Sequence, residues 1–301
     1  MIIAFVSVFA AKAYASIGPG DFPKTTSIDG LTREYVIHVP RISVVPASGI
    51  PVVIYVHGGG GTAQDAYNDG IDKTSDRHKF ILLVPVGINK SWNGGRWEGG
   101  SCCGTQNDVK FISTMIDEVS RDYPVDSHRI YAMGISNGGL MTNRLACELS
   151  QKIAAIATVA PAAIEGNCAP VRPVPVLDIH GTGDTCNPYY GGIPPLDCAN
   201  VPLDCANVPY TRMTPRQVTA TWLEINGCSP FPLDIVYHYG DATCVSFRNC
   251  TAADVAFCKV EGMGHTWPSG SQYLPPCMVG PVSYDISTEQ IWQFFRHHPI
   301  P

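Results

Sequence analysis

The sequence predicts an α/β protein with a mainly parallel central sheet and helices on both of its faces. Short apolar segments rich in Val and Ile alternate with stretches whose apolar residues recur at helical spacing. The chain has 301 residues, 45% hydrophobic and 15% charged, which is enough for one large core. No linker-like segment divides the chain, so we expect a single domain over residues 16–301.

The first half of the chain carries three predicted strands. Residues 33–40 predict an early, partly exposed strand, and residues 51–56 and 80–85 predict two buried strands. The strand at 51–56 runs directly into the glycine run His57-Gly-Gly-Gly-Gly61.

Helices and strands alternate in the middle of the chain. A helix is expected to begin near Asn107, because its apolar residues then recur at helical spacing. Residues 128–133 predict a strand and residues 138–149 the helix that follows it. Residues 153–159 and 174–179 predict two further strands.

The last third of the chain contains two helices with readable N-termini. Thr214-Pro215 predicts the start of a helix that ends at Asn226-Gly227. Residues 231–239 and 256–260 predict late strands. Ser287-Thr-Glu-Gln290 is a capping box in front of a final helix.

Residues 1–15 predict a secretory signal peptide. An apolar segment at 2–11 precedes the small-x-small sequence Ala13-Tyr14-Ala15, although a buried N-terminal strand is the alternative. Twelve cysteines suit several disulfides in an oxidising compartment, so we expect a secreted, disulfide-stabilised protein. The spacings C-x-x-C and H-E-x-x-H do not occur, so we expect no metal site.

The net charge of −6 argues against nucleic acid and anionic membrane surfaces as partners. No segment reaches the length needed to span a bilayer, and we expect a monomer. One loop is unusual, because Leu-Asp-Cys-Ala-Asn-Val-Pro at 196–202 is repeated without change at 203–209. This tandem duplication adds one cysteine and is too short to be a structural repeat.

The most informative motif is Gly134-Ile-Ser-Asn-Gly138. It is a G-x-S-x-G sequence between a predicted strand and a predicted helix, which is the context of a nucleophile elbow. The residues two before and two after the serine crowd each other in such a turn, and both are glycine here. Ser136 is therefore the candidate nucleophile.

A serine nucleophile needs a base and a group that orients the base. Asp184 and His265 follow Ser136 in the chain, each in a glycine-containing loop directly after an apolar strand. Asp178, inside a strand, and Asp241, in a later turn, are weaker candidates for the acid.

Other histidines fit the role of base less well. His57 and His180 lie at strand ends, where a structural hydrogen bond is the better interpretation, and His297 and His298 lie at the C-terminus.

Oxyanion donors are expected from two main-chain N–H groups. One is assigned to Gly59, with Gly60 as the alternative, and the other to Asn137 directly after the nucleophile.

Three tryptophans in loops indicate an aromatic or apolar platform for substrate. They are Trp92, Trp97 and Trp267, and the alternative is that they cap the core from outside. Cys102 and Cys103, in the same loop as Trp97, are expected to bond to two different places.

The chain resembles the secreted esterase family that joins feruloyl esterases of carbohydrate esterase family one with polyhydroxybutyrate depolymerases. The resemblance extends from about Gly30 to His298 and rests on these segments: His57-Gly-Gly, Cys102-Cys103 before Asn107-Asp-Val-Lys-Phe-Ile, Gly134-Ile-Ser-Asn-Gly-Gly with Leu145-Ala-Cys147, His180-Gly-Thr-Gly-Asp184, Gly264-His-Thr-Trp-Pro268 and Ile291-Trp-Gln-Phe-Phe. It implies an α/β-hydrolase fold, a triad of Ser136, Asp184 and His265, and no metal or organic cofactor. The chain departs from the family pattern in the long loop from Cys186 to Tyr210.

The resulting hypothesis is a secreted serine carboxylesterase acting on feruloyl esters of plant cell-wall polysaccharide. Polyhydroxybutyrate and acetylated xylan are the alternative substrates. The rival from another class is a non-catalytic secreted binding protein. It would require a broken triad, and none of the three positions is broken.

Overall fold

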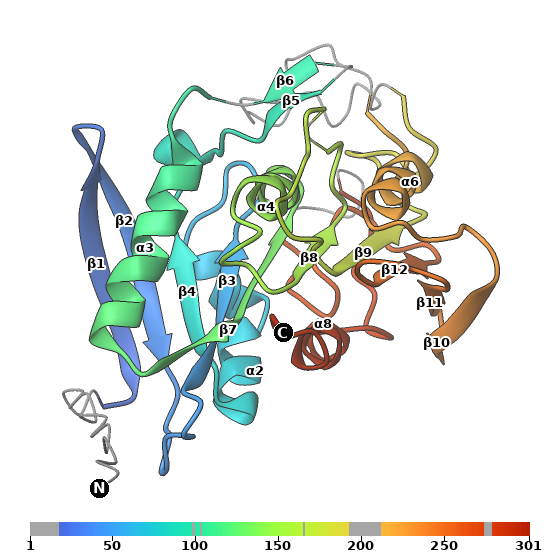
Figure 1. Cartoon of the computed structure of the whole chain (residues 1–301). Helices are drawn as coiled ribbons and strands as arrows, with labels where there is room; N and C mark the ends of the chain where they lie inside the picture. Colours follow the sequence, from blue (N-terminus) through green and yellow to red (C-terminus); the bar gives the residue numbers. More distant parts are fainter. Residues whose placement is uncertain (1–17, 98–99, 103, 165, 193–211, 274–278) are drawn as a thin grey trace, which may run out of the picture.

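The computed structural model describes residues 18–97, 100–102, 104–164, 166–192, 212–273 and 279–301 (Figure 1). The predicted signal peptide at 1–15 and the duplication at 196–209 lie outside the described residues. Within the described residues, no helix is long and apolar enough to cross a membrane.

The described strands form one ten-stranded sheet and a separate hairpin. The sheet follows this order: β1 (Gly20–Ile28), β2 (Leu31–Val39), β4 (Ile81–Pro85), β3 (Ile50–Val56), β7 (Val125–Ile135), β8 (Ile156–Val159), β9 (Val176–Gly181), β12 (Val255–Val260), β11 (Ala242–Phe247) and β10 (Leu233–Tyr239). The strands from β4 to β12 in this order are parallel, and the two strands at each edge are antiparallel. The predicted mainly parallel sheet is confirmed.

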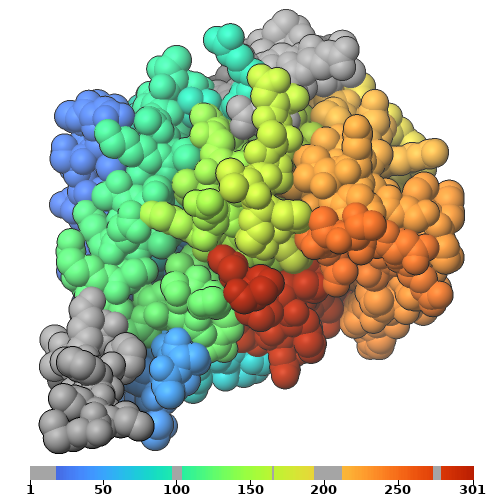
Figure 2. Space-filling model, viewed as in Figure 1, coloured from blue at the N-terminus to red at the C-terminus, as the bar shows by residue number. Residues whose placement is uncertain are grey.

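Helices cover both faces of the sheet, as predicted. One face packs against α3 (Asp108–Asp122), α4 (Asn137–Glu148) and α6 (Pro215–Ile225). The other packs against α1 (Gln64–Asn68), α2 (Ile71–His78) and α8 (Thr288–Arg296). Side chains alternate along β3, so that Val52 and Ile54 enter the first core and Val53 and Tyr55 the second. Figure 2 looks onto α3 and α4, coloured green to yellow-green, with orange α6 beside them.

The predicted helix starts are present with their capping groups. Asn107 caps α3 by accepting a hydrogen bond from the Lys110 N–H at 3.1 Å. Thr214 and Ser287 each form a complete capping box, at α6 and α8 respectively. Side-chain oxygens satisfy main-chain donors that a helix start leaves without an intrahelical partner, which explains why these boundaries are readable from sequence.

The structure adds elements that the sequence pattern did not indicate. They are β1, α1, α2, β11, η1 (Ile88–Lys90) and the hairpin of β5 (Gly95–Trp97) and β6 (Gly100–Cys102). β1 is an edge strand of largely exposed polar residues, so its sequence lacks the apolar alternation of a buried strand. It forms because its backbone pairs with β2 along the whole of both strands.

A buried ion pair fastens β2 to α3. The strand is partly exposed, as predicted, but Arg33 is buried: its guanidinium lies 2.7 Å from an oxygen of Asp108, with both side chains 1% exposed. Arg33 also lies over the Phe111 ring at 4.1 Å. The second carboxylate oxygen of Asp108 accepts the Asn93 N–H at 2.7 Å, so the same residue holds the loop after β4.

Three disulfides are described. Cys147–Cys168 joins the end of α4 to a loop, Cys228–Cys250 joins the segment after α6 to the segment after β11, and Cys244–Cys258 joins paired positions of β11 and β12. The expectation of several disulfides is confirmed. Cys103, Cys198, Cys205, Cys277 and the side chain of Cys102 lie outside the described part of the chain.

Candidate active site

Ser136 lies in a tight turn between β7 and α4. Its backbone has φ 58° and ψ −121°, a conformation that is rare for residues other than glycine and is retained where the surroundings fix it. One of these restraints is the Ser136 N–H, which donates to the Val159 carbonyl of β8 at 2.9 Å. The turn therefore has the strained geometry that exposes a serine hydroxyl at the end of a strand.

The two glycines of the motif are required by close packing. A Cβ on Gly134 would lie 2.5 Å from the Gly138 carbonyl oxygen and 2.7 Å from Thr142 Oγ1. A Cβ on Gly138 would collide with the carbonyl oxygens of Val56 and His57. The predicted crowding across the turn is present, and it extends to the end of β3.

Asp184 and His265 meet at the carboxyl ends of β9 and β12. His265 Nδ1 lies 2.8 Å from Asp184 Oδ2. The other oxygen of Asp184 accepts the N–H groups of Cys186 and Asn187, both at 2.8 Å. Burial alone would raise the pKa of Asp184, but the charge and hydrogen bonds of His265 and His180 hold it well below its usual range. The carboxylate is therefore ionised and fixed by donors on both oxygens.

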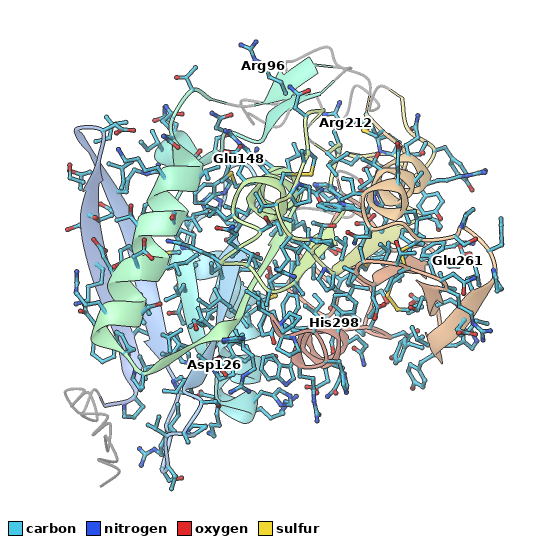
Figure 3. All side chains as sticks on the ribbon, viewed as in Figure 1. Arg96, Asp126, Glu148, Arg212, Glu261 and His298 are labelled. Carbon is cyan, nitrogen blue, oxygen red and sulfur yellow. A yellow bond between two sulfur atoms is a disulfide. The ribbon has the colours of Figure 1, made fainter. Side chains whose placement is uncertain are left out.

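A second layer of polar residues holds the acid in place. His180 is fully buried, and its Nε2 donates to the Asn187 carbonyl at 2.8 Å and lies 3.3 Å from Asp184 Oδ2. Asn187 donates to the Ala160 carbonyl at 2.7 Å, and Arg212, labelled in Figure 3, donates to the Asn187 side chain at 2.8 Å. The structural interpretation of His180 agrees with these contacts. No motif or spacing in the sequence indicates Asn187 or Arg212.

His57 fixes the glycine run in front of the serine. Its Nδ1 donates to the Gly58 carbonyl at 2.7 Å and its Nε2 accepts the Gly87 N–H at 3.1 Å. Burial lowers the pKa of His57, so the neutral ring that these two bonds require is the stable form. His57 is thus a structural residue, as expected from its position at a strand end.

The glycine run favours Gly59 over Gly60 as an oxyanion donor. The Gly60 N–H donates to the Lys90 carbonyl at 2.8 Å and the Gly61 N–H to the Gly58 carbonyl at 3.0 Å. Gly59 lies in the turn that the bond from Gly61 to Gly58 closes, and it borders the same cavity as Ser136.

Asn137 is the first residue of α4, where main-chain N–H groups point out of the helix. Its side chain is held by the Trp92 backbone, accepting the N–H at 2.8 Å and donating to the carbonyl at 3.0 Å. These bonds fix the first turn of the helix beside Ser136.

The serine and histidine open into one cavity of about 430 Å³, a size that suits a small organic ligand. The described lining also includes the glycine run and residues of β3, β7, α1 and the loops after β4, β9 and β12. These residues are Tyr55, Gly58, Gly59, Gly60, Gly61, Asp65, Asn68, Asp69, Lys90, Ile135, Cys186, Trp267, Ser271, Tyr273 and Val279.

The structure separates the three candidate tryptophans. Trp267 lines the cavity and packs edge-to-face on Tyr55, with ring centroids 5.3 Å apart. Trp92 does not line the cavity: its fully buried side chain packs on His57 and donates to the His57 carbonyl at 3.0 Å. The expected substrate contact of Trp92 is therefore replaced by a structural role. The Trp97 backbone belongs to β5, and its side chain lies outside the described residues.

Over the residues that the structure describes, no group of three or more His, Cys, Asp or Glu side chains could hold a metal ion.

Comparisons with known proteins give relatives over most of the chain. Feruloyl esterase B of Piromyces equi is 32% identical over 221 residues, which cover 70% of this chain and 37% of that protein. Feruloyl esterase C of Emericella nidulans is 28% identical over 305 residues, covering 98% of this chain and 96% of the relative. No protein-family model matches.

Among solved structures, an acetyl xylan esterase from Aspergillus awamori superposes with a TM-score of 0.58 at 16% identity. The match covers 91% of this chain and 99% of the other. The fold is that of an α/β-hydrolase, so the predicted fold is confirmed. The relatives of this chain include feruloyl esterases, which confirms the resemblance seen in its motifs.

Proposed function

We propose that this protein is a secreted serine carboxylesterase that hydrolyses feruloyl and related hydroxycinnamoyl esters of plant cell-wall polysaccharide. The observation that carries the proposal is the hydrogen-bonded Asp184–His265 pair, whose histidine borders the same cavity as Ser136 in its strained turn. Nucleophile, base and orienting acid are the three parts that acyl transfer to a serine requires.

In the proposed mechanism, Ser136 Oγ attacks the ester carbonyl as His265 Nε2 takes its proton. Asp184 accepts the His265 Nδ1–H at 2.8 Å, which leaves Nε2 as the base and stabilises the imidazolium that forms. The N–H groups of Gly59 and Asn137 stabilise the oxyanion, each by about 3 kcal/mol. The imidazolium then protonates the leaving alcohol, and an acyl-enzyme remains on Ser136.

Water completes the reaction. His265 removes a proton from the water that attacks the acyl-enzyme, and returns it to Ser136 Oγ as the carboxylic acid leaves. The residues used in these steps are side chains and main-chain groups of this chain alone.

The substrate class is supported by the relatives rather than by the triad, because the triad serves any ester. Two relatives bear the name feruloyl esterase, and a third is named a bifunctional acetylxylan esterase/xylanase. Secretion is supported by the apolar segment at 2–11 and by the three described disulfides, since disulfides persist in oxidising compartments.

The proposal is tested with Ser136→Ala on methyl ferulate, acetylated xylan and polyhydroxybutyrate. We expect wild-type kcat/KM to be highest on methyl ferulate, and the variant to lose a factor on the order of 10⁴ or more on every substrate that wild type hydrolyses. Ser246→Ala, in β11 outside the cavity lining, is the matched control and should keep full activity. Full activity of Ser136→Ala would refute the assignment of the nucleophile, and a preference for acetylated xylan would refute the assignment of the acyl group.

A further inference from the structure

The cavity has an acidic wall that the proposed mechanism does not use. Asp65 and Asn68 come from α1, and Asp69 is the C-cap residue of the same helix. All three line the cavity together with Ser136 and His265. Carboxylates near an ester-binding cavity have no role in the acyl transfer described above, so they call for another explanation.

Asp69 is held in place while part of its hydrogen-bonding capacity stays available. Its Oδ2 accepts the Tyr55 hydroxyl at 2.8 Å, and its Oδ1 has the Ser271 N–H at the long distance of 3.4 Å. A Cβ on Gly270 would collide with Oδ1, so the loop passes close to the carboxyl group only because that residue is glycine. An ionised carboxylate offers about four acceptor positions, and two protein donors face this one.

The acidic group lies on the same side of the sheet as the apolar lining of the cavity. Tyr55 on β3 pairs with Met133 on β7, three residues before the nucleophile. Tyr55, Ile135 and Trp267 belong to one core cluster and all line the cavity. Trp267 packs edge-to-face on Tyr55, whose hydroxyl in turn reaches Asp69. The carboxyl group of Asp69 is thus linked to the aromatic part of the cavity lining through Tyr55.

We propose that Asp69 determines acyl specificity by hydrogen bonding to a hydroxyl at the far end of an aromatic acyl group, while Trp267 and Ile135 contact its ring. The inference rests on the proposed function and goes beyond it. In this proposal Asp69 makes the enzyme prefer 4-hydroxycinnamoyl esters to cinnamoyl and acetyl esters.

The ionisation of Asp69 is compatible with this role. Burial raises the pKa of Asp69 to about 7, against the effect of the hydrogen bonds from Tyr55 and Ser271. The carboxylate accepts a hydrogen bond from a phenolic hydroxyl, and the protonated acid donates one to it. A bound acyl group without the hydroxyl would exclude water from the carboxyl group and offer it no hydrogen-bond partner. A binding site built in this way discriminates strongly against the analogue that lacks the hydroxyl.

The test compares methyl p-coumarate with methyl cinnamate, which differ by the 4-hydroxyl alone. We expect wild-type kcat/KM to favour p-coumarate by at least about tenfold, and Asp69→Asn to reduce this ratio at least about threefold, because a neutral amide is a weaker acceptor than a carboxylate. Hydrolysis of p-nitrophenyl acetate is measured in the same variants to record any general loss of turnover, which cancels in the ratio of p-coumarate to cinnamate. Asp76→Asn, an exposed aspartate of α2 outside the cavity lining, is the matched control and should keep the wild-type ratio.

A purely structural role for Asp69 predicts a different pattern. If the residue only anchored the 269–271 loop, Asp69→Asn would lower kcat/KM for all three esters in parallel, and the proposal would be overturned. A wild-type ratio near unity, or an unchanged ratio in Asp69→Asn, would overturn it as well.

Binding separates failure of this inference from failure of the proposed function. Ser136→Ala should bind methyl p-coumarate at least about tenfold more tightly than methyl cinnamate, and adding Asp69→Asn should reduce this difference at least about threefold. Tight binding of p-coumarate without any Ser136-dependent hydrolysis would support the subsite and refute the esterase. Equal binding in Ser136→Ala would overturn the subsite, whatever the activity.

Discussion

Replacement of Asp184 by Asn tests the orienting acid with little change in shape. Asp184 Oδ1 accepts two main-chain N–H groups, and Oδ2 faces His265 Nδ1 and His180 Nε2. Asn keeps one oxygen, which the two main-chain donors hold at the Oδ1 position. The new NH₂ group then faces His265 and requires an acceptor there.

His265 must then change its tautomer. Its Nδ1 becomes the acceptor and the proton moves to Nε2, which can then no longer receive the proton of Ser136. A triad with the wrong histidine tautomer loses a factor of about 10⁴ in kcat, so we expect a loss of this order in Asp184→Asn. KM should change little, because Asp184 is buried behind His265 and does not line the cavity.

The assay is steady-state hydrolysis of methyl ferulate by wild type, Asp184→Asn and Asp241→Asn. Asp241, the weaker candidate for the acid, accepts the Ser283 hydroxyl at 2.7 Å and does not line the cavity, so Asp241→Asn should keep activity within about threefold. A kcat of Asp184→Asn within tenfold of wild type would refute the reasoning. So would a loss of the same size in Asp241→Asn.

Three further predictions concern stability. Arg33→Met leaves Asp108 buried without its ion-pair partner and should lower the free energy of unfolding by about 3–5 kcal/mol in urea titrations; a loss below about 1 kcal/mol would contradict this. Folding raises the pKa of Asp69 from 3.8 to about 7, so between these pH values the folded protein binds one proton more than the unfolded chain. The free energy of unfolding should therefore fall by about 4 kcal/mol as the pH rises through this range. Asp69→Asn should remove that fall, and an unchanged pH profile of unfolding would contradict the shift. Reduction of the disulfides should lower Tm, since each contributes about 2–4 kcal/mol, and a thiol titration that found most cysteines free in the unreduced protein would contradict the pairing.

The parts of the site that sequence could predict are those set by local chemistry. Gly134 and Gly138 are needed within a single turn, so the elbow is readable from five consecutive residues. Asp184 and His265 were found because each follows an apolar strand in a glycine-containing loop, and strands of a parallel sheet end at one edge. The helix caps at Asn107, Thr214 and Ser287 are local in the same way.

The parts that escaped sequence analysis depend on contacts between distant segments. Asp69 faces the cavity because a glycine loop 202 residues later in the chain folds over it. Trp92 and Trp267 both lie in predicted loops and both are buried, yet Trp92 packs against His57 and Trp267 lines the cavity. Nothing in the residues beside each tryptophan distinguishes these outcomes, since the difference comes from how the loops pack on the sheet.

The strand order also determines how much of the chain is needed before the site is whole. Ser136 is in place once β7 and β8 have paired, but the partner of Asp184 arrives 81 residues after it, on the loop that follows β12. During synthesis the nucleophile is thus present long before its base. A chain that ends before β12 contains the serine and the acid but lacks the histidine. We therefore expect ester hydrolysis only after β12 has paired with β9.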